Sequence, residues 1–371
     1  MDLMPAFRQD NVQALLPAVQ PMLQWFEKSA RDLPWRREVT PYRVWVSEIM
    51  LQQTRVEAVK PYFARFMEQL STVEALASVP EEQLFKLWEG LGYYSRARNL
   101  QKAAKEIVMQ YGGQLPPSFD ALLRLPGIGR YTAGAIAAQA YGIPAPAVDG
   151  NVMRVISRLL GSRCDIMAQK TRREAEEVLM QVMQGVPAGA FVQAWMELGA
   201  TVCVPNGQPQ CLCCPAAPWC AAFQQCITDE LPVKAAKKAR RREDKTVFLL
   251  FCQGQFALRK RPDEGLLAGL WEFPWAEGHM DEQEALRQLE QWGIEAERKD
   301  LYPLPPAKHI FTHIEWHMCG YALSIPHQPE QEWLWVDAEG QQEVAVPSAF
   351  AKYLKIAHKH CAGHMSHMDT K

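Results

Sequence analysis

Glu48 is a carboxylate on an apolar stretch of the chain, which is an unusual place for an ionised group. It lies in the segment 42–54, YRVWVSEIMLQQT. At helical spacing it stands between Trp45 and Ile49, so burial should disfavour its ionised form and raise its pKa. A carboxyl group that keeps its proton near neutral pH suits a general acid. The structural alternative is a carboxylate that is paired with an arginine such as Arg36.

A second carboxylate, Asp149, stands in the stretch AVDGNVMR at the expected beginning of a helix. A side chain in this position commonly accepts hydrogen bonds from backbone N–H groups of the first helical turn. On the residues alone, an N-cap is therefore the favoured explanation for Asp149.

A cluster of cysteines predicts a metal site. Five of the ten cysteines fall within 18 residues, and Cys213 is one of them. Four thiolates in a compact loop suit a [4Fe–4S] cluster or a structural zinc ion, and reduced cysteines without a metal are the alternative. All nine histidines lie at position 279 or later, so no histidine is a nearby ligand in sequence. The spacing of the four is Cys203-x7-Cys211-x2-Cys214-x5-Cys220.

The segment 122–134, LLRLPGIGRYTAG, predicts two helices joined by a tight turn that contains Gly127 and Gly129. Such a turn exposes backbone N–H groups at the start of the second helix, where an anion such as a phosphate can bind. The net charge is −2, and residues 1–230 carry 22 basic and 22 acidic residues. Because a strongly basic domain is missing, binding to DNA would depend on such backbone groups and on local basic patches. A plain helix connector is the alternative.

Periodicity divides the chain into a helical part and a mixed part. An all-α domain is predicted at residues 1–228, and it contains the four-cysteine loop 203–220. A basic linker is predicted at residues 229–245. Residues 246–360 predict an α+β domain, and the tail 361–371 is expected to fray. Strands are expected at 246–252, 255–261, 309–323 and 332–336, and a helix at 281–292.

A composition of 48% hydrophobic and 22% charged residues excludes disorder as the main state. No apolar run is long enough to span a membrane, and no secretory signal is expected.

Long motifs in this order resemble one family. They are SEIMLQQTRVEAVKPYF (47–63), LWEGLGYYSRARNL (87–100), LPGIGRYTAGAI (125–136), VDGNVMRV (148–155) and the four-cysteine loop. Together they resemble the adenine DNA glycosylases (MutY family) of the helix-hairpin-helix, or endonuclease III, superfamily. Two features depart from the family pattern. The first gap between cysteines is seven residues where six is more usual, and Phe311-Thr312-His313 stands where the family usually has Phe-Ser-His.

The resemblance implies a helix-hairpin-helix glycosylase domain with one [4Fe–4S] cluster, followed by a MutT-like (Nudix) domain that recognises 8-oxoguanine. It implies excision of adenine opposite 8-oxoguanine or guanine in duplex DNA, as part of base excision repair. We expect a monomer in the bacterial cytoplasm that associates with no membrane.

The resemblance also assigns roles to residues. Glu48 is the implied general acid, which protonates adenine N7, and Asp149 the carboxylate that stabilises the cationic sugar. Tyr131 and Asn151 match supporting positions beside Asp149. The positions implied for substrate binding are Trp35, Arg36 and Gln193 around the flipped adenine, Gln53, Thr54, Leu91 and Tyr93 in the base stack, and Thr312 and His313 for reading 8-oxoguanine.

Three other functions compete with this one. An endonuclease III-like glycosylase/lyase would need an amine nucleophile, and Tyr131 stands where such enzymes carry a lysine. A nucleotide pyrophosphohydrolase would need the metal-binding glutamates of the MutT signature, but its best match, 286–294, keeps only Glu290. The third is a non-catalytic iron–sulfur protein that binds DNA.

Overall fold

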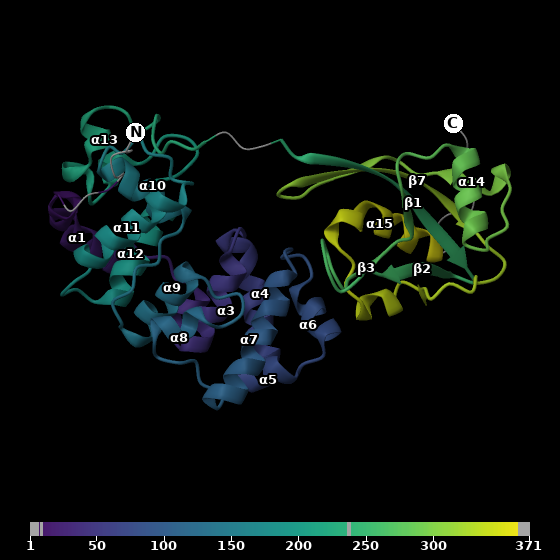
Figure 1. Ribbon diagram of the computed structural model, residues 1–371, viewed down its shortest axis with the longest axis horizontal. Helices are drawn as coiled ribbons and strands as arrows, with labels where there is room; N and C mark the ends of the chain where they lie inside the picture. Colours follow the sequence, from purple (N-terminus) through teal and green to yellow (C-terminus); the bar gives the residue numbers. More distant parts are fainter. Residues whose placement is uncertain (1–6, 8–9, 236–238, 363–371) are drawn as a thin grey trace. The chain divides into compact units, whose positions relative to one another are not determined.

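The computed structural model describes residue 7, residues 10–235 and residues 239–362. The chain forms two compact units (Figure 1). The first comprises Met1–Ser78 and Asn99–Ala236, and the second comprises Val79–Arg98 and Lys237–Lys371. The last passage of the chain from the first unit to the second lies within the predicted linker. Residues 363–371 of the predicted tail lie outside the described residues.

The first unit is helical, as the periodicity predicts. Its helices include α1 (Asp10–Ser29), α2 (Pro34–Arg37), α3 (Pro41–Leu51), α4 (Val56–Gln69), α5 (Val73–Ser78), α8 (Phe119–Leu123), α9 (Arg130–Tyr141), α10 (Gly150–Leu159), α11 (Gln169–Val182), α12 (Ala188–Thr201) and α13 (Ala221–Gln224). Most of α7 (Ser95–Tyr111) also belongs to it. One core joins α1 with α9 through α12, and α3 packs on α4 and α9. The first helix, α1, begins at Asp10, within the range predicted to be helical.

Local caps explain where the helices around the site begin. The Thr40 hydroxyl accepts a hydrogen bond from the backbone N–H of Arg43 at 3.2 Å, and Pro41 occupies the first turn of α3. This start is the one that the Thr-Pro pair predicts. Eight of the eleven residues of α3 are buried, and Glu48 is one of them.

The second unit is an α+β domain around one eight-stranded sheet. The strands are β1 (Arg241–Cys252), β2 (Gln255–Lys260), β3 (Trp271–Glu272), β4 (Trp275–Glu277), β5 (Tyr302–Pro303), β6 (Ala307–Ile310), β7 (Ile314–Ser324) and β8 (Leu334–Val336). β1 and β7 pair in parallel from Arg241↔Ile314 to Phe251↔Ser324, and all other pairs are antiparallel.

The central strand β1 is buried on both faces, which explains its continuous apolar run. Val247, Leu249 and Phe251 pack in the core that includes α15 (Ala351–Cys361), and the alternate residues pack in the core that includes α14 (Glu282–Gln291). This alternation is the period of two of a β-strand. The predicted helix at 281–292 corresponds to α14.

The structure corrects two strands of the mixed part. β1 begins at Arg241, before the strand expected from residue 246. The expected single strand 309–323 is a hairpin of β6 and β7, because the chain turns at 311–313. This turn carries Thr312 and His313.

Residues 79–98, with α6 (Glu81–Trp88), belong to the second unit although they precede most of the first unit's helices in sequence. The Lys86 ammonium donates to the Val344 carbonyl at 3.4 Å, and the Val346 N–H donates to Glu89 at 3.2 Å. The Arg98 guanidinium donates to the Ala268 carbonyl at 3.0 Å.

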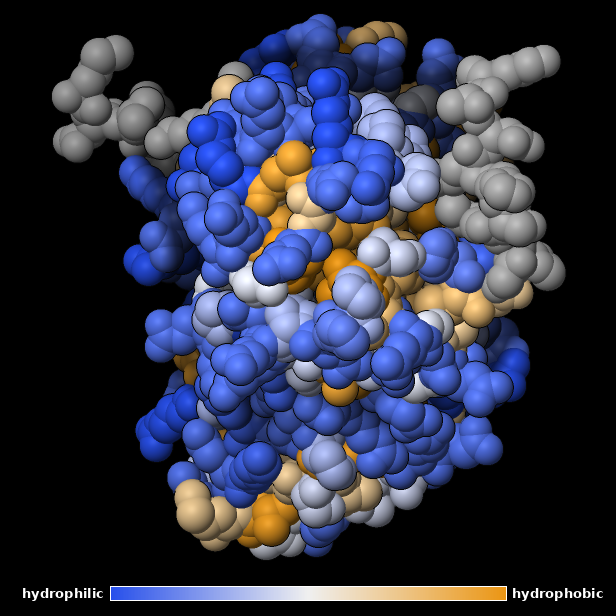
Figure 2. All heavy atoms as spheres, turned by 90° about the vertical axis from the view of Figure 1, so that its right-hand side faces the viewer, coloured by the Kyte–Doolittle hydropathy of each residue, from blue (hydrophilic) through white to orange (hydrophobic). Residues whose placement is uncertain are grey.

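Polar residues cover most of the face that Figure 2 shows, with apolar residues visible in places between them. Among the described residues, no helix combines the length and the apolar character that crossing a bilayer requires.

Candidate active site and cysteine site

One cavity of the first unit, with an empty volume of about 1520 Å³, brings together most of the predicted site residues. Its walls come from helices α2, α3, α9 and α12, from the starts of α4 and α10, and from α11. Leu91, Tyr93, Thr312 and His313 belong to the second unit instead. The predicted residues that line the cavity are Trp35, Arg36, Glu48, Gln53, Thr54, Tyr131, Asp149, Asn151 and Gln193.

Glu48 is 5% exposed and is bonded to neutral side chains rather than to an arginine. Its Oε2 accepts a hydrogen bond from the Tyr131 hydroxyl at 2.6 Å, and its Oε1 accepts one from Gln139 Nε2 at 3.1 Å. Burial raises the pKa of Glu48, although these two bonds act in the opposite direction. Burial also raises the pKa of Tyr131, so its hydroxyl remains a donor. The alternative of an ion pair between Glu48 and Arg36 is therefore wrong.

Asp149 is the N-cap of α10, as its position indicates, and it also lines the cavity. Its Oδ1 accepts from the Val152 N–H and its Oδ2 from Asn151 Nδ2, both at 2.8 Å. Burial raises the pKa of Asp149, while these hydrogen bonds oppose the rise. The positive end of the α10 dipole further favours a carboxylate at this position.

Asn151 is held in turn by α12 and Arg154. A Cβ at Gly199 would lie 2.6 Å from the Asn151 Cβ, so only glycine allows this approach of α12. Arg154 Nη2 donates to Asn151 Oδ1 at 2.9 Å, and Arg154 Nε donates to the Cys203 carbonyl at 2.7 Å. The support of Asp149 therefore extends to the first cysteine of the loop.

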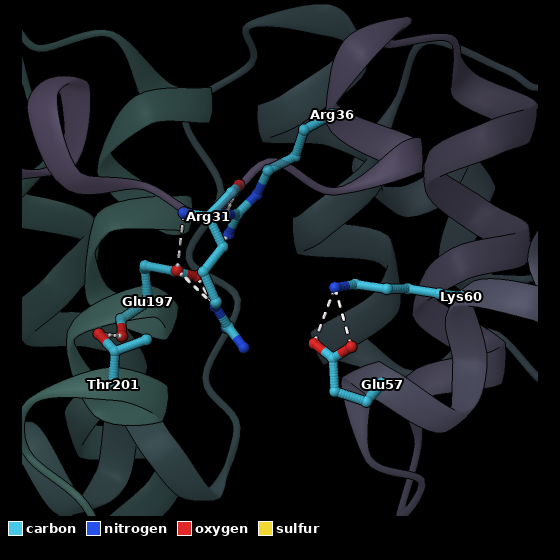
Figure 3. Close-up of polar contacts among 6 residues, drawn as sticks. All are labelled: Arg31, Arg36, Glu57, Lys60, Glu197 and Thr201. Carbon is cyan, nitrogen blue, oxygen red and sulfur yellow. Dashed lines mark hydrogen bonds and ion pairs between the residues drawn. The ribbon is translucent and has the colours of Figure 1, made fainter.

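Arg36 is bonded to Glu197, a residue that lies outside the motifs and predicted site residues of the sequence. Glu197 is buried on α12, and its carboxylate binds both Arg31 and Arg36 (Figure 3). Gln139 was also missed. Glu197 lies in the apolar stretch QAWMELGA, so the signal that drew attention to Glu48 could have found it.

The hairpin has the predicted form, with α8 and α9 on either side of the turn. Gly127 has a φ of +72°, and a Cβ there would lie 2.7 Å from the Asn99 Cβ. Gly129 is the N-cap of α9, has an ordinary φ of −89° and makes no side-chain cap. Gly127 is thus required by the turn itself, whereas Gly129 leaves the first N–H groups of α9 accessible.

The four predicted cysteine ligands line one largely apolar cavity with an empty volume of about 390 Å³. Cys213 and Cys226 do not line it and are exposed. Arg158 Nη1 lies 3.3 Å from the Cys203 sulfur, and burial raises the pKa of Cys214 to about 12. Across the described ranges, no group of three His, Cys, Asp or Glu residues is placed to hold a single metal ion. Thiolate sulfur is the donor that zinc ions and iron–sulfur clusters bind, so the chemistry of these four side chains suits such a group.

The remaining predicted residues lie in the second unit. Tyr93, Thr312 and His313 line a cavity with an empty volume of about 1160 Å³, and the Tyr93 hydroxyl lies 2.9 Å from the Thr312 hydroxyl. Leu91 is 6% exposed, so its side chain does not reach the surface in this conformation. Gln53 and Tyr93 have φ values of 55° and 47°. Such strained backbone is common at functional positions.

Comparison with known proteins assigns the chain to a family. Residues 46–181 match the HhH-GPD superfamily of base excision DNA repair proteins, and residues 246–356 match the NUDIX domain. Adenine DNA glycosylase of Rattus norvegicus is 34% identical over 92% of this chain and 78% of its own length. The enzyme of Buchnera aphidicola subsp. Acyrthosiphon pisum is 30% identical over 91% of this chain and 96% of its own.

Solved structures of DNA glycosylases are similar as well. A thermostable thymine-DNA glycosylase has a TM-score of 0.54 and 27% identity, and covers 59% of this chain and 100% of its own. Endonuclease III in a non-covalent complex with DNA has a TM-score of 0.50 and 26% identity, and covers 58% of this chain and 98% of its own. The chain therefore belongs to the adenine DNA glycosylase family.

Proposed function

We propose that this glycosylase hydrolyses the N-glycosidic bond of adenine opposite 8-oxoguanine or guanine in duplex DNA. The observation that carries the proposal is the cavity in which Glu48 and Asp149 have different partners. A base inside a duplex is out of reach, so the adenine has to be flipped into this cavity. Trp35, Arg36 and Gln193 line it and would surround the base.

Glu48 would supply the proton that lets adenine leave as a neutral base. Cleavage proceeds through an oxocarbenium-like state, and a protonated leaving group lowers that barrier. Burial keeps Glu48 protonated to a higher pH than an exposed glutamate. Tyr131 and Gln139 hold its two oxygens and thereby orient the carboxyl group.

Asp149 would act in its ionised form against the positive charge that develops on the sugar. Two hydrogen bonds fix the carboxylate before the substrate arrives, so little reorganisation is needed during the reaction. The supporting role proposed for Asn151 is this direct bond. Tyr131 contacts Glu48 rather than Asp149, so we propose that it supports the acid.

The reaction is proposed to stop at an abasic site without cutting the strand. Lyase chemistry needs an amine, and the residues described as lining the cavity include no lysine. Lys234 lines a neighbouring cavity that Asp149 shares, so slow reaction of this amine with an abasic product would be a side reaction.

We propose that Cys203, Cys211, Cys214 and Cys220 hold one [4Fe–4S] cluster. When bound, it would cross-link the loop through four iron–sulfur bonds. Cys213 would remain a free thiol.

The second unit is proposed to read the base opposite adenine. Thr312 and His313 stand on an exposed turn between β6 and β7, where hydroxyl and imidazole groups can reach a base edge. Gln53, Thr54 and Tyr93 would contact the base stack, and Leu91 would do so only after its loop opens. The turn that contains Gly127 and Gly129 would expose backbone N–H groups of the hairpin, which would bind the phosphates of the DNA backbone. We also propose that the protein acts as a monomer in the bacterial cytoplasm.

A strand-cleavage assay tests this function. Duplexes that carry A·8-oxoguanine, A·G or A·T are incubated with the protein and analysed with and without alkali. We expect cleavage of the adenine strand only after alkali, and only in the first two duplexes. Intact strands in all three would reject the proposal. Efficient cutting without alkali, with stoichiometric borohydride trapping through one lysine, would instead establish a lyase.

A further inference from the structure

Glu197 is a buried carboxylate that the proposed reaction does not use. Its side chain is 1% exposed, yet it lines the same cavity as Glu48 and Asp149. A carboxylate is retained in such a place only when its charge is compensated by close partners.

The partners of Glu197 are two guanidinium groups from the chain that precedes α3. Its Oε1 accepts from Arg31 Nε at 2.6 Å and from the Arg31 backbone N–H at 3.1 Å. Its Oε2 accepts from Arg31 Nη2 and from Arg36 Nη2, each at 2.9 Å. Arg36 Nη1 donates to the Arg31 carbonyl at 3.1 Å. One carboxylate therefore fixes two cations (Figure 3), and all three residues line the cavity.

The network of Glu197, Arg31 and Arg36 is linked to the pKa of Glu48 through the charge of Arg36. The positive charge of Arg36 lowers the pKa of Glu48, against the effect of burial. The other groups that act on Glu48 are Tyr131 and Gln139 from α9, which favour ionisation, and the charge of Asp149, which opposes it. Two further cations, Arg31 and Arg172 of α11, line the cavity. Glu197 lies 2.9 Å from Arg36, and a negative charge at that distance offsets part of the field of the guanidinium.

We propose that Glu197 is a positioning residue, which holds Arg31 and Arg36 in the wall of the cavity that Glu48 also lines and compensates the charge of Arg36 there. The inference rests on the proposed function, because it concerns the acid of that reaction. Without Glu197, the uncompensated arginines would stabilise the ionised form of Glu48, and the enzyme would lose its acid at a lower pH.

The test is single-turnover excision from an A·8-oxoguanine duplex as a function of pH, with the full chain. Glu197→Gln keeps the shape and removes the charge, so the midpoint of the alkaline decline should fall by about one pH unit. Above that midpoint the rate should be about tenfold below wild type. Arg36→Gln removes the cation, so the midpoint of the alkaline decline should rise in this variant, at whatever rate it excises adenine. The matched control is Glu57→Gln, which removes an exposed carboxylate bonded to Lys60 and should leave the midpoint unchanged.

A merely structural role would lower the rate or the melting temperature of Glu197→Gln without moving its midpoint, and that result would overturn the inference. Should Glu197→Gln fail to fold, Arg36→Gln decides: a higher midpoint supports the inference, and an unchanged or lower one refutes it. These outcomes are distinct from failure of the proposed function, in which the wild-type protein leaves adenine in place.

Discussion

Glu48 is buried and Asp149 is half-buried, and their different partners support the separate roles proposed for them. Glu48 is bonded to a phenol and an amide from another helix, and nothing on its own helix favours a charge. Asp149 sits at a helix N-terminus, where the backbone N–H of Val152 and the dipole both favour the carboxylate. The first is suited to give up a proton and the second to remain ionised.

The first prediction is a bell-shaped pH dependence of single-turnover excision. The rate should fall as the pH rises through the raised pKa of Glu48, because the acid is then ionised. It should also fall at low pH, where Asp149 becomes protonated and no longer opposes the sugar cation. Since the two carboxylates interact, the apparent pKa values of the two limbs belong to the pair and not to either residue. Variants at each position are needed to assign each limb to one carboxylate.

The second prediction makes that assignment. Glu48→Gln should bind an A·8-oxoguanine duplex about as well as wild type but excise adenine ~10²–10⁴-fold more slowly, without the alkaline limb. Asp149→Asn should also be slow, but it should lose the acid limb and keep the alkaline one. Near wild-type excision by Glu48→Gln would show that Glu48 is a satisfied core carboxylate and that another group supplies the proton.

At the scale of elements, helix starts could be predicted because they depend on neighbouring residues. Thr40-Pro41 and Asp149-Gly150 mark the beginnings of α3 and α10 by their own chemistry. The partners of Glu48 could not be predicted, since Tyr131 and Gln139 reach it only through the packing of α9 on α3. The hairpin at 311–313 was missed for a similar reason. Its turn contains no glycine or proline, so the strand pattern appears continuous.

The third prediction concerns the link between α12 and the chain before α3. Burial alone would raise the pKa of Glu197, but the bonds and charges of Arg31 and Arg36 lower it from 4.5 to about 2. A lowered pKa contributes stability above the ordinary pKa and loses it as the pH falls through the folded one. The carboxylate should therefore contribute about 3 kcal/mol to the free energy of unfolding at neutral pH, lost between pH 4.5 and 2.

Urea unfolding of the first unit at several pH values measures this contribution. Between pH 4.5 and 2, the free energy of unfolding of the wild type should fall more steeply than that of Glu197→Gln, which lacks the titrating group. Glu57→Gln again serves as the control, because its carboxylate is 75% exposed and its ion pair contributes little. Parallel slopes for wild type and Glu197→Gln would mean that the network does not stabilise the fold.

The fourth prediction concerns the cysteine loop. Purified protein should be yellow-brown and contain about four irons, because four cysteines line one cavity. Cys213→Ser should keep the colour, since Cys213 is exposed and points to no shared site, whereas Cys211→Ser should bleach or destabilise the protein. Equimolar zinc without iron after anaerobic purification would contradict the cluster.

For the molecule as a whole, the division of the chain into units differs from a simple split along the sequence. Residues 79–98 are bonded to the mixed unit through Lys86, Glu89 and Arg98. Composition could distinguish the helical part from the mixed part, but it could not place this segment. Its sequence is that of an ordinary amphipathic helix, and the contacts that decide its place are with residues more than 150 positions away.

The last prediction separates excision from recognition of the opposite base. A chain that ends near residue 230 keeps Glu48 and Asp149 but loses Thr312 and His313, so it should still excise adenine. Its preference for 8-oxoguanine over guanine opposite adenine should fall by about tenfold, or ~1.4 kcal/mol, the scale of one lost base contact. The truncation also removes the partners of residues 79–98, which should lower excision from both duplexes. Thr312→Ala with His313→Ala in the full chain keeps those partners, so it should lower the preference alone. If this double variant weakens excision equally on both duplexes, the second unit supports the fold of residues 79–98 and does not read the opposite base.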